Sequence, residues 1–152
     1  MATATSRGVG TYEVAHPVTR SEPAWQAYRI LHVALVVVPI VAGVDKFLEW
    51  LADWDIYLSP MAVDILGDFS QEFMLLVGVI EIVAGIGVAL WPRVFAYVVA
   101  AWLGGIIVNL LLSGSFYDIA LRDFGLMLGA LALGRLAAAF ARTPRSASQS
   151  ST

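Results

Sequence analysis

Four long apolar stretches alternate with polar segments along this chain. They cover about residues 25–51, 71–91, 94–113 and 119–140. A membrane-crossing α-helix needs about 20 mostly apolar residues to span the ~30 Å hydrocarbon layer. The second and third stretches meet this requirement, and Pro92 directly after Trp91 predicts a tight turn that joins them as a helical hairpin. The pattern therefore predicts an all-α fold, an integral membrane four-helix bundle.

The composition supports a membrane protein of one domain. The chain has 152 residues, of which 59% are hydrophobic and 14% charged, whereas soluble domains are nearer half apolar and a quarter charged. The chain has no cysteine, which excludes thiolate catalysis and Cys-ligated metal centres within it. The net charge of −3 and the lack of a Lys/Arg cluster give no indication of nucleic-acid binding. Abundant Ala, Gly and Arg suggest a bacterial source.

Both ends of the chain differ from its apolar middle. Residues 1–24 are polar and lack an apolar run, so we expect a disordered tail. This tail is too long and polar to begin a cleaved signal peptide, so the first helix should remain in the mature protein. Residues 142–152 are rich in Ser and Arg and predict a second disordered tail. The expected membrane domain is residues 25–141.

The basic residues predict how the helices are oriented in the membrane. Lys and Arg accumulate on the cytoplasmic side of membrane proteins. With the N-terminus inside, seven basic residues lie on the inner side and two in the outer half. We therefore expect a multi-pass protein of the cell (inner) membrane with both termini cytoplasmic (N-in, C-in). The inner residues are Arg7, Arg20, Arg29, Arg93, Arg135, Arg142 and Arg145, and the outer ones are Lys46 and Arg122.

The first external loop, about residues 52–70, is acidic and has features of a membrane-surface segment. Trp50, Trp54 and Tyr57 suit the interface, where an aromatic ring has one wet and one apolar end. Residues 60–66 should form a short helix with Ser59 as its N-cap.

Several polar side chains must lie at membrane depth, because the charge-free parts of the first and last stretches are too short to span a bilayer. Only 15 residues separate Arg29 from Asp45, and only 11 separate Asp123 from Arg135. Glu81 lies about 15 Å deep in the second helix, near the midplane. One polar cluster in the outer half is therefore expected. The candidates for a ligand or proton site are Asp45, Lys46, Glu81, Asn109, Arg122 and Asp123.

This cluster has two interpretations. Three carboxylates face two cations, and a buried carboxylate without a partner usually takes a proton. Glu81 is the deepest and so the one expected to be neutral. The cluster is then either a structural network that sets helix register, or a proton-exchanging site for a quinone or small polar ligand. In the second case Glu81 carries the proton and Arg122 or Lys46 holds an oxygen.

Metal and cofactor sites of other kinds lack support. A haem between two helices needs two axial ligands, but the only histidine besides His32 is His16 in the tail. His32 is therefore expected to be a hydrogen-bonded interfacial residue. No metal site and no hydrolase motif is expected, and a quinone is the one cofactor that remains a candidate.

Small and kinked positions predict how the helices pack. Gly125 and Gly129 form a small-xxx-small face on the fourth helix, and Gly78 lies in the second. Packing inside one bundle is favoured for this face, with a homo-oligomer as the alternative. Pro39 should kink the first helix.

Three short motifs lie in order along the apolar stretches: Gly43–Phe47 (GVDKF), Val79–Gly85 (VIEIVAG) and Leu121–Phe124 (LRDF). They resemble the Gly-x-Asp-Lys-hydrophobic, Glu-then-Gly and Asp-bearing last-span motifs of the DoxX family (DoxX/DoxD-like superfamily) of small bacterial and archaeal four-helix membrane proteins. The resemblance covers about residues 29–138, and its motifs contain most of the polar cluster.

The resemblance implies an association with redox processes. Members of the family are subunits of a thiosulfate:quinone oxidoreductase or terminal quinol oxidase, or form membrane complexes with detoxifying enzymes. We therefore expect an accessory or anchor subunit of a quinone-linked redox complex, non-catalytic by itself, in contact with the lipid bilayer and a redox partner protein. The alternatives are a small-molecule transporter or channel-like protein, which would need a polar path through the inner half, and a purely structural membrane protein.

Overall fold

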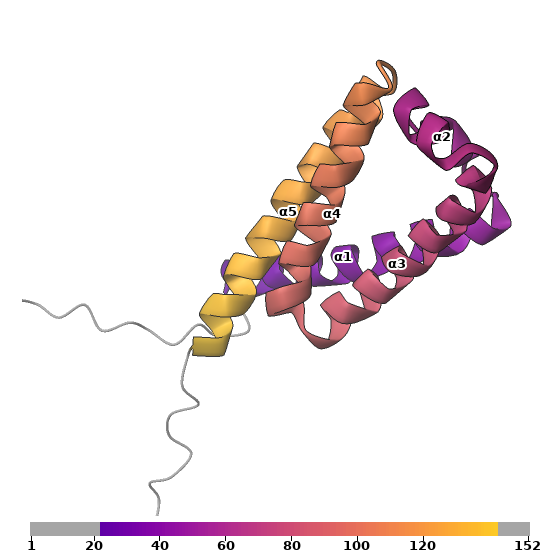
Figure 1. Ribbon diagram of the computed structural model, residues 1–152. Helices are drawn as coiled ribbons and strands as arrows, with labels where there is room; N and C mark the ends of the chain where they lie inside the picture. Colours follow the sequence, from indigo (N-terminus) through magenta and orange to yellow (C-terminus); the bar gives the residue numbers. More distant parts are fainter. Residues whose placement is uncertain (1–21, 143–152) are drawn as a thin grey trace, which may run out of the picture.

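The computed structural model describes residues 22–142, and these fold into four long helices with short connections (Figure 1). The long helices are α1 (Pro23–Leu48), α3 (Ser70–Leu90), α4 (Pro92–Leu112) and α5 (Tyr117–Arg142). Four helical segments are long and apolar enough to cross a membrane, so the predicted all-α fold with four membrane-length helices is confirmed. The predicted tails lie, apart from residues 22–24 and 142, outside the described residues.

Local sequence signals explain where these helices begin and end. Pro23 and Pro92 stand in the first turn of α1 and α4, where the missing N–H of proline costs nothing. Pro39 lies inside α1, which continues through it. The first helix ends at Leu48, three residues earlier than predicted, because Glu49 has a left-handed backbone (φ 52°).

The loop between α1 and α3 holds the short helix α2 (Pro60–Leu66) and two 3₁₀ turns, Asp55–Tyr57 and Gly67–Phe69. The Ser59 hydroxyl accepts a hydrogen bond from the Ala62 N–H (3.2 Å), as an N-cap residue does. The predicted surface helix and its cap are therefore confirmed.

The long helices form two pairs that diverge like the arms of a wedge (Figure 1). Helix α1 packs along α3, and α4 packs along α5, whereas α3 and α4 contact each other much less. The predicted hairpin of α3 and α4 thus has the tight turn at Trp91 but not the packed arms. Gly78 and Gly85 of α3 lie against α1, whereas Gly87, near the turn, lies against Phe95 of α4.

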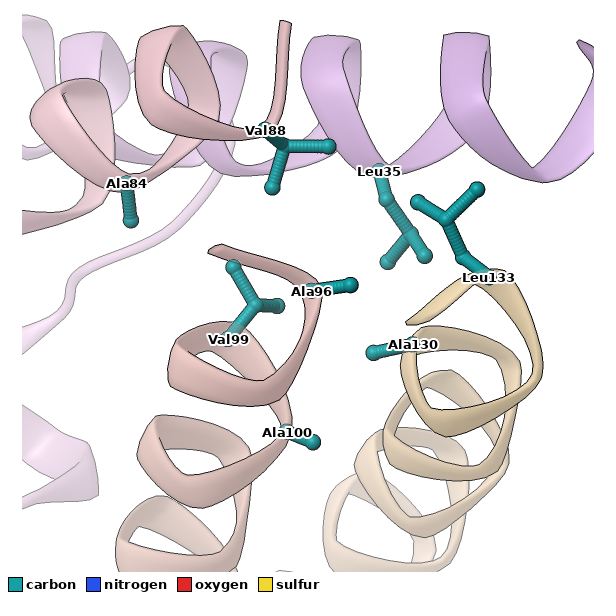
Figure 2. Close-up of a cluster of buried hydrophobic side chains, with 8 residues drawn as sticks. All are labelled: Leu35, Ala84, Val88, Ala96, Val99, Ala100, Ala130 and Leu133. Atoms are coloured by element: carbon teal, nitrogen blue, oxygen red, sulfur yellow. The ribbon is translucent and has the colours of Figure 1, made fainter. Parts of the chain in front are cut away.

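The narrow end of the wedge is filled by an apolar core to which all four long helices contribute (Figure 2). Its most buried members, Val88, Ala96, Ala130 and Leu133, have no exposed surface. Many large apolar side chains elsewhere on the helices are exposed, as expected for surfaces in contact with lipid. The core consists of Leu35, Ala84, Val88, Ala96, Val99, Ala100, Ala130 and Leu133.

Helices α1 and α3 approach closely at a pair of glycines. A Cβ atom at Gly43 would lie 2.5 Å from the Gly78 carbonyl oxygen, and one at Gly78 would lie 2.8 Å from the Gly43 carbonyl oxygen. The predicted small-xxx-small face of α5, formed by Gly125 and Gly129, does not make so close an approach to another helix. A Cβ atom at Gly129 would lie 3.6 Å from the Leu31 side chain, but one at Gly125 would meet no atom within 4 Å. Gly125 therefore does not pack against another described helix, because it lies on an exposed face of α5.

Candidate functional site

A cavity of about 630 Å³ lies between the two helix pairs, bordered by residues of α1, α3, α4, α5 and the loop that contains α2. Its walls are mostly apolar, and its polar side chains come mainly from the helix ends nearest this loop and from the loop itself. Five of the six predicted site residues line it, and only Asp45 does not. The polar lining residues are Lys46, Trp54, Tyr57, Glu81, Trp102, Asn109, Arg122 and Asp123.

A buried ion pair joins α1 to α3 in the wall of this cavity. Lys46 Nζ lies 2.7 Å from Glu81 Oε2, and the two side chains are 3% and 9% exposed. Lys46 and Glu81 each follow one of the paired glycines by three residues, so the close approach of α1 and α3 places them opposite each other. Glu81, the carboxylate expected to be neutral, is therefore one that has a cation beside it.

Within the described part of the chain, Asp45 is the carboxylate of the predicted cluster that has no cation, and N–H donors surround it instead. It accepts hydrogen bonds from the backbone N–H groups of Trp50 (3.1 Å) and Leu51 (3.0 Å) and from the Trp54 indole N–H (2.8 Å). Hydrogen bonds to an ionised carboxylate are stronger than neutral ones. Asp45 is 4% exposed, and its function in the fold is to end α1 and hold the start of the loop.

Asn109 of α4 holds the other end of the same loop segment. Its Oδ1 atom accepts a hydrogen bond from the Ser59 N–H (3.0 Å), and its Nδ2 atom donates one to the Tyr57 carbonyl (2.7 Å). Both halves of the carboxamide are thus engaged with loop backbone. Asn109 borders the cavity as predicted, but its Oδ1 and Nδ2 atoms are hydrogen-bonded to the loop backbone. These two hydrogen bonds are therefore not available to a ligand.

Arg122 and Asp123 lie at the α5 side of the cavity. Arg122 Nε is 3.1 Å from Asp123 Oδ1, and the two side chains are 62% and 8% exposed. An ion pair with so exposed a partner contributes little to stability. The exposed guanidinium is nevertheless a cation at the edge of the cavity, where an oxygen-bearing ligand can reach it.

Two tryptophans belong to the site although sequence reasoning did not select them as site residues. Trp54 was predicted only as an interfacial aromatic, yet Lys46 Nζ lies 3.6 Å from the centroid of its ring. Trp102 of α4 has a buried Nε1 that approaches the Glu81 carboxylate without forming a hydrogen bond of ordinary geometry. The signal that could have found Trp102 is its indole N–H, which needs a partner when it lies in an apolar helix.

His32 lies far from this cluster, near the narrow end of the wedge. Its Nε2 atom is 3.0 Å from the Val88 carbonyl oxygen, one of the last carbonyls of α3, so the predicted hydrogen-bonded role is confirmed. Among residues 22–142, no three His, Asp or Glu side chains are grouped so that they could hold a metal ion.

Comparison of the chain with protein-family models, curated proteins and solved structures finds no match.

Proposed function

We propose that this chain is a multi-pass membrane subunit of a quinone-linked redox complex, and that the cavity between its helix pairs holds the quinone headgroup. The observation that carries the proposal is a mostly apolar cavity of about 630 Å³ with the buried Lys46–Glu81 pair in its wall. An isoprenoid quinone matches this combination, because it has a mostly apolar body and two polar oxygens. Ligand sites commonly combine apolar walls with a few placed polar groups.

The polar groups of the cavity fit both redox forms of such a ligand. A quinone carries carbonyl oxygens, which accept hydrogen bonds, and a quinol carries hydroxyl groups, which also donate them. The Lys46 ammonium and the Trp102 N–H are donors, and the Glu81 carboxylate is an acceptor. When bound, a quinone supplies two-electron, two-proton redox chemistry. The chain has no cysteine, so an iron–sulfur or thiol centre that exchanges those electrons belongs to a partner protein.

The sequence supports the cellular setting of this proposal. The bias of basic residues favours an orientation with both termini cytoplasmic and the loop between α1 and α3 outside. The abundance of Ala, Gly and Arg favours the cell (inner) membrane of a bacterium. The acidic side chains of that loop are the surface that we expect the redox partner to contact. The resemblance to the DoxX family, carried by Gly43–Phe47, Val79–Gly85 and Leu121–Phe124, agrees with a quinone-linked complex.

Transport of a small solute is less consistent with the same geometry. A solute path would have to continue through the narrow end of the wedge, and the apolar core fills that end with side chains such as Val88 and Leu133, which have no exposed surface. His32 lies at that end, and it is hydrogen-bonded to the α3 backbone. The other alternative is a purely structural role for the Lys46–Glu81 ion pair, and experiment must distinguish this role from ligand binding.

Two measurements test the proposal. The full chain, purified from its native membrane in mild detergent, is analysed by mass spectrometry for co-purifying quinone and redox proteins. The chain in lipid nanodiscs is then titrated with decylubiquinone, and quenching of its tryptophan fluorescence reports binding. Titrated with the reduced form, decylubiquinol, E81Q should bind at least about tenfold more weakly than the unaltered chain, because the quinol hydroxyl loses a charged acceptor. The matched control D64N alters an exposed carboxylate of α2 that does not line the cavity and should bind normally.

The outcomes separate the alternatives. The absence of both a co-purifying quinone and saturable quenching would contradict the proposal. If folded E81Q binds decylubiquinol as tightly as the unaltered chain does, the Lys46–Glu81 pair serves packing alone and the structural role is favoured.

A further inference from the structure

The segment from Trp50 to Ser59, here called the loop lid, borders the cavity on the side away from the apolar core. Trp54, Tyr57 and Leu58 of the loop lid line the cavity. Ser59, at its end, is 2% exposed although it lies in a connection between helices. Tyr57, Leu58 and Ser59 therefore pack toward the site, while Trp50, Leu51 and Ile56 of the same segment are exposed.

The loop lid is attached to both helix pairs. At α1, Asp45 accepts hydrogen bonds from Trp50, Leu51 and the Trp54 indole. At α4, the Asn109 carboxamide binds the Tyr57 carbonyl and the Ser59 N–H.

A ring contact adds to the second attachment. The ring of Tyr57 packs edge-on against that of Phe116 in the turn between α4 and α5, with 4.9 Å between the ring centroids. The two arms diverge toward this end (Figure 1), and the loop lid bridges them there.

The two ends of the cavity are thus bordered by different parts of the chain. The apolar core lies at the narrow end, and residues of the loop lid line the wide end. The loop lid also shields the ion pair, since the Trp54 ring lies over the Lys46 ammonium. A ligand that enters while the loop lid is in place has to pass sideways between the two helix pairs, where membrane-spanning helices face lipid and not water.

We infer that the loop lid shuts the cavity to water and that Asn109 is the positioning residue that keeps the loop lid in place. The cavity then takes molecules dissolved in the bilayer rather than water-soluble ones. Within the proposed function, on which this choice of ligand rests, the class is a quinone with a long isoprenoid tail. Asn109 suits the role because releasing the loop lid would leave its carboxamide and two loop backbone groups without partners.

Cysteine labelling tests the loop lid without any ligand. The chain has no cysteine, so one introduced thiol is the only target. V77C places it in the cavity wall, at a residue that is 9% exposed, and S115C places it on the exposed turn between α4 and α5. Lipid nanodiscs leave both membrane faces wet, so the result does not depend on orientation. The probes are a cationic methanethiosulfonate and neutral N-ethylmaleimide, and the mass of the intact chain measures the labelling.

We expect S115C to react with both probes. V77C should react with N-ethylmaleimide. With the cationic probe, V77C should react at least a hundredfold more slowly than S115C does. Adding N109A to V77C should raise cationic labelling at least tenfold. Adding W54F, which removes the indole bond to Asp45 and keeps an aromatic ring, should raise it as well, and this variant provides the test if N109A does not fold.

Two results would overturn the inference: cationic labelling of V77C as fast as that of S115C, or labelling of V77C that neither N109A nor W54F changes. A closed loop lid in a chain that binds no decylubiquinone would reject the proposed function and leave the loop lid intact. An open loop lid in a chain that binds the quinone would reject the loop lid alone.

Discussion

Replacing Gly43 by alanine should separate α1 from α3 and destabilise the protein. The added Cβ would lie 2.5 Å from the Gly78 carbonyl oxygen and 2.9 Å from Ile82 Cγ1, whereas ordinary contact begins at 3.4 Å. The oxygen belongs to the backbone of α3 and cannot rotate away. The two helices must therefore move apart locally by about 0.9 Å.

The cost follows from the packing and from the ion pair next to it. Overpacking of this kind typically costs about 1–3 kcal/mol. The separation also stretches the 2.7 Å contact between Lys46 and Glu81, because each lies three residues beyond one of the two glycines. Gly125 provides the matched control, since a Cβ atom there would meet no atom within 4 Å. G125A should be neutral or stabilise by up to about 1 kcal/mol, the gain of alanine over glycine in a helix.

The assay is reversible unfolding of the chain in dodecylmaltoside micelles by increasing fractions of sodium dodecyl sulfate, followed by tryptophan fluorescence and far-ultraviolet circular dichroism. G43A should unfold at a lower dodecyl sulfate fraction than G125A, by a difference of about 1–4 kcal/mol in unfolding free energy. Equal stability of G43A and G125A would refute the conclusion that the contact of Gly43 with Gly78 sets the spacing of α1 and α3.

Other contacts give further predictions in the same unfolding assay. K46M should destabilise the chain by about 3–5 kcal/mol because it leaves the buried Glu81 carboxylate without its cation. The double variant K46M/E81L should recover most of this loss, and no recovery would show that the pair is not the cause. R122Q should cost less than about 1 kcal/mol, since its side chain is 62% exposed. S59A should cost about 1 kcal/mol and speed hydrogen exchange in α2, while the bond from the Ser59 backbone to Asn109 is kept, and unchanged exchange would argue against the cap.

The sequence alone determined the features that depend on short-range rules. Apolar length predicts each membrane helix, because the hydrocarbon layer has one thickness everywhere. The Ser59 cap and the prolines that begin α1, α2 and α4 act within one helical turn. The short gap between Arg29 and Asp45 predicted that Lys46 lies at membrane depth, and the position of Glu81 in the middle of the second apolar stretch predicted the same for Glu81.

Only the tertiary structure decided which groups meet, because this depends on how each helix is rotated about its axis and on contacts between distant parts of the chain. Glu81 has a partner because close-packed glycines bring in Lys46, 35 residues away. Asn109 binds loop backbone 50 and 52 residues away, which no spacing rule connects with it. Gly125 fits a helix-packing motif, yet it faces no other described helix, because α5 turns that face outward.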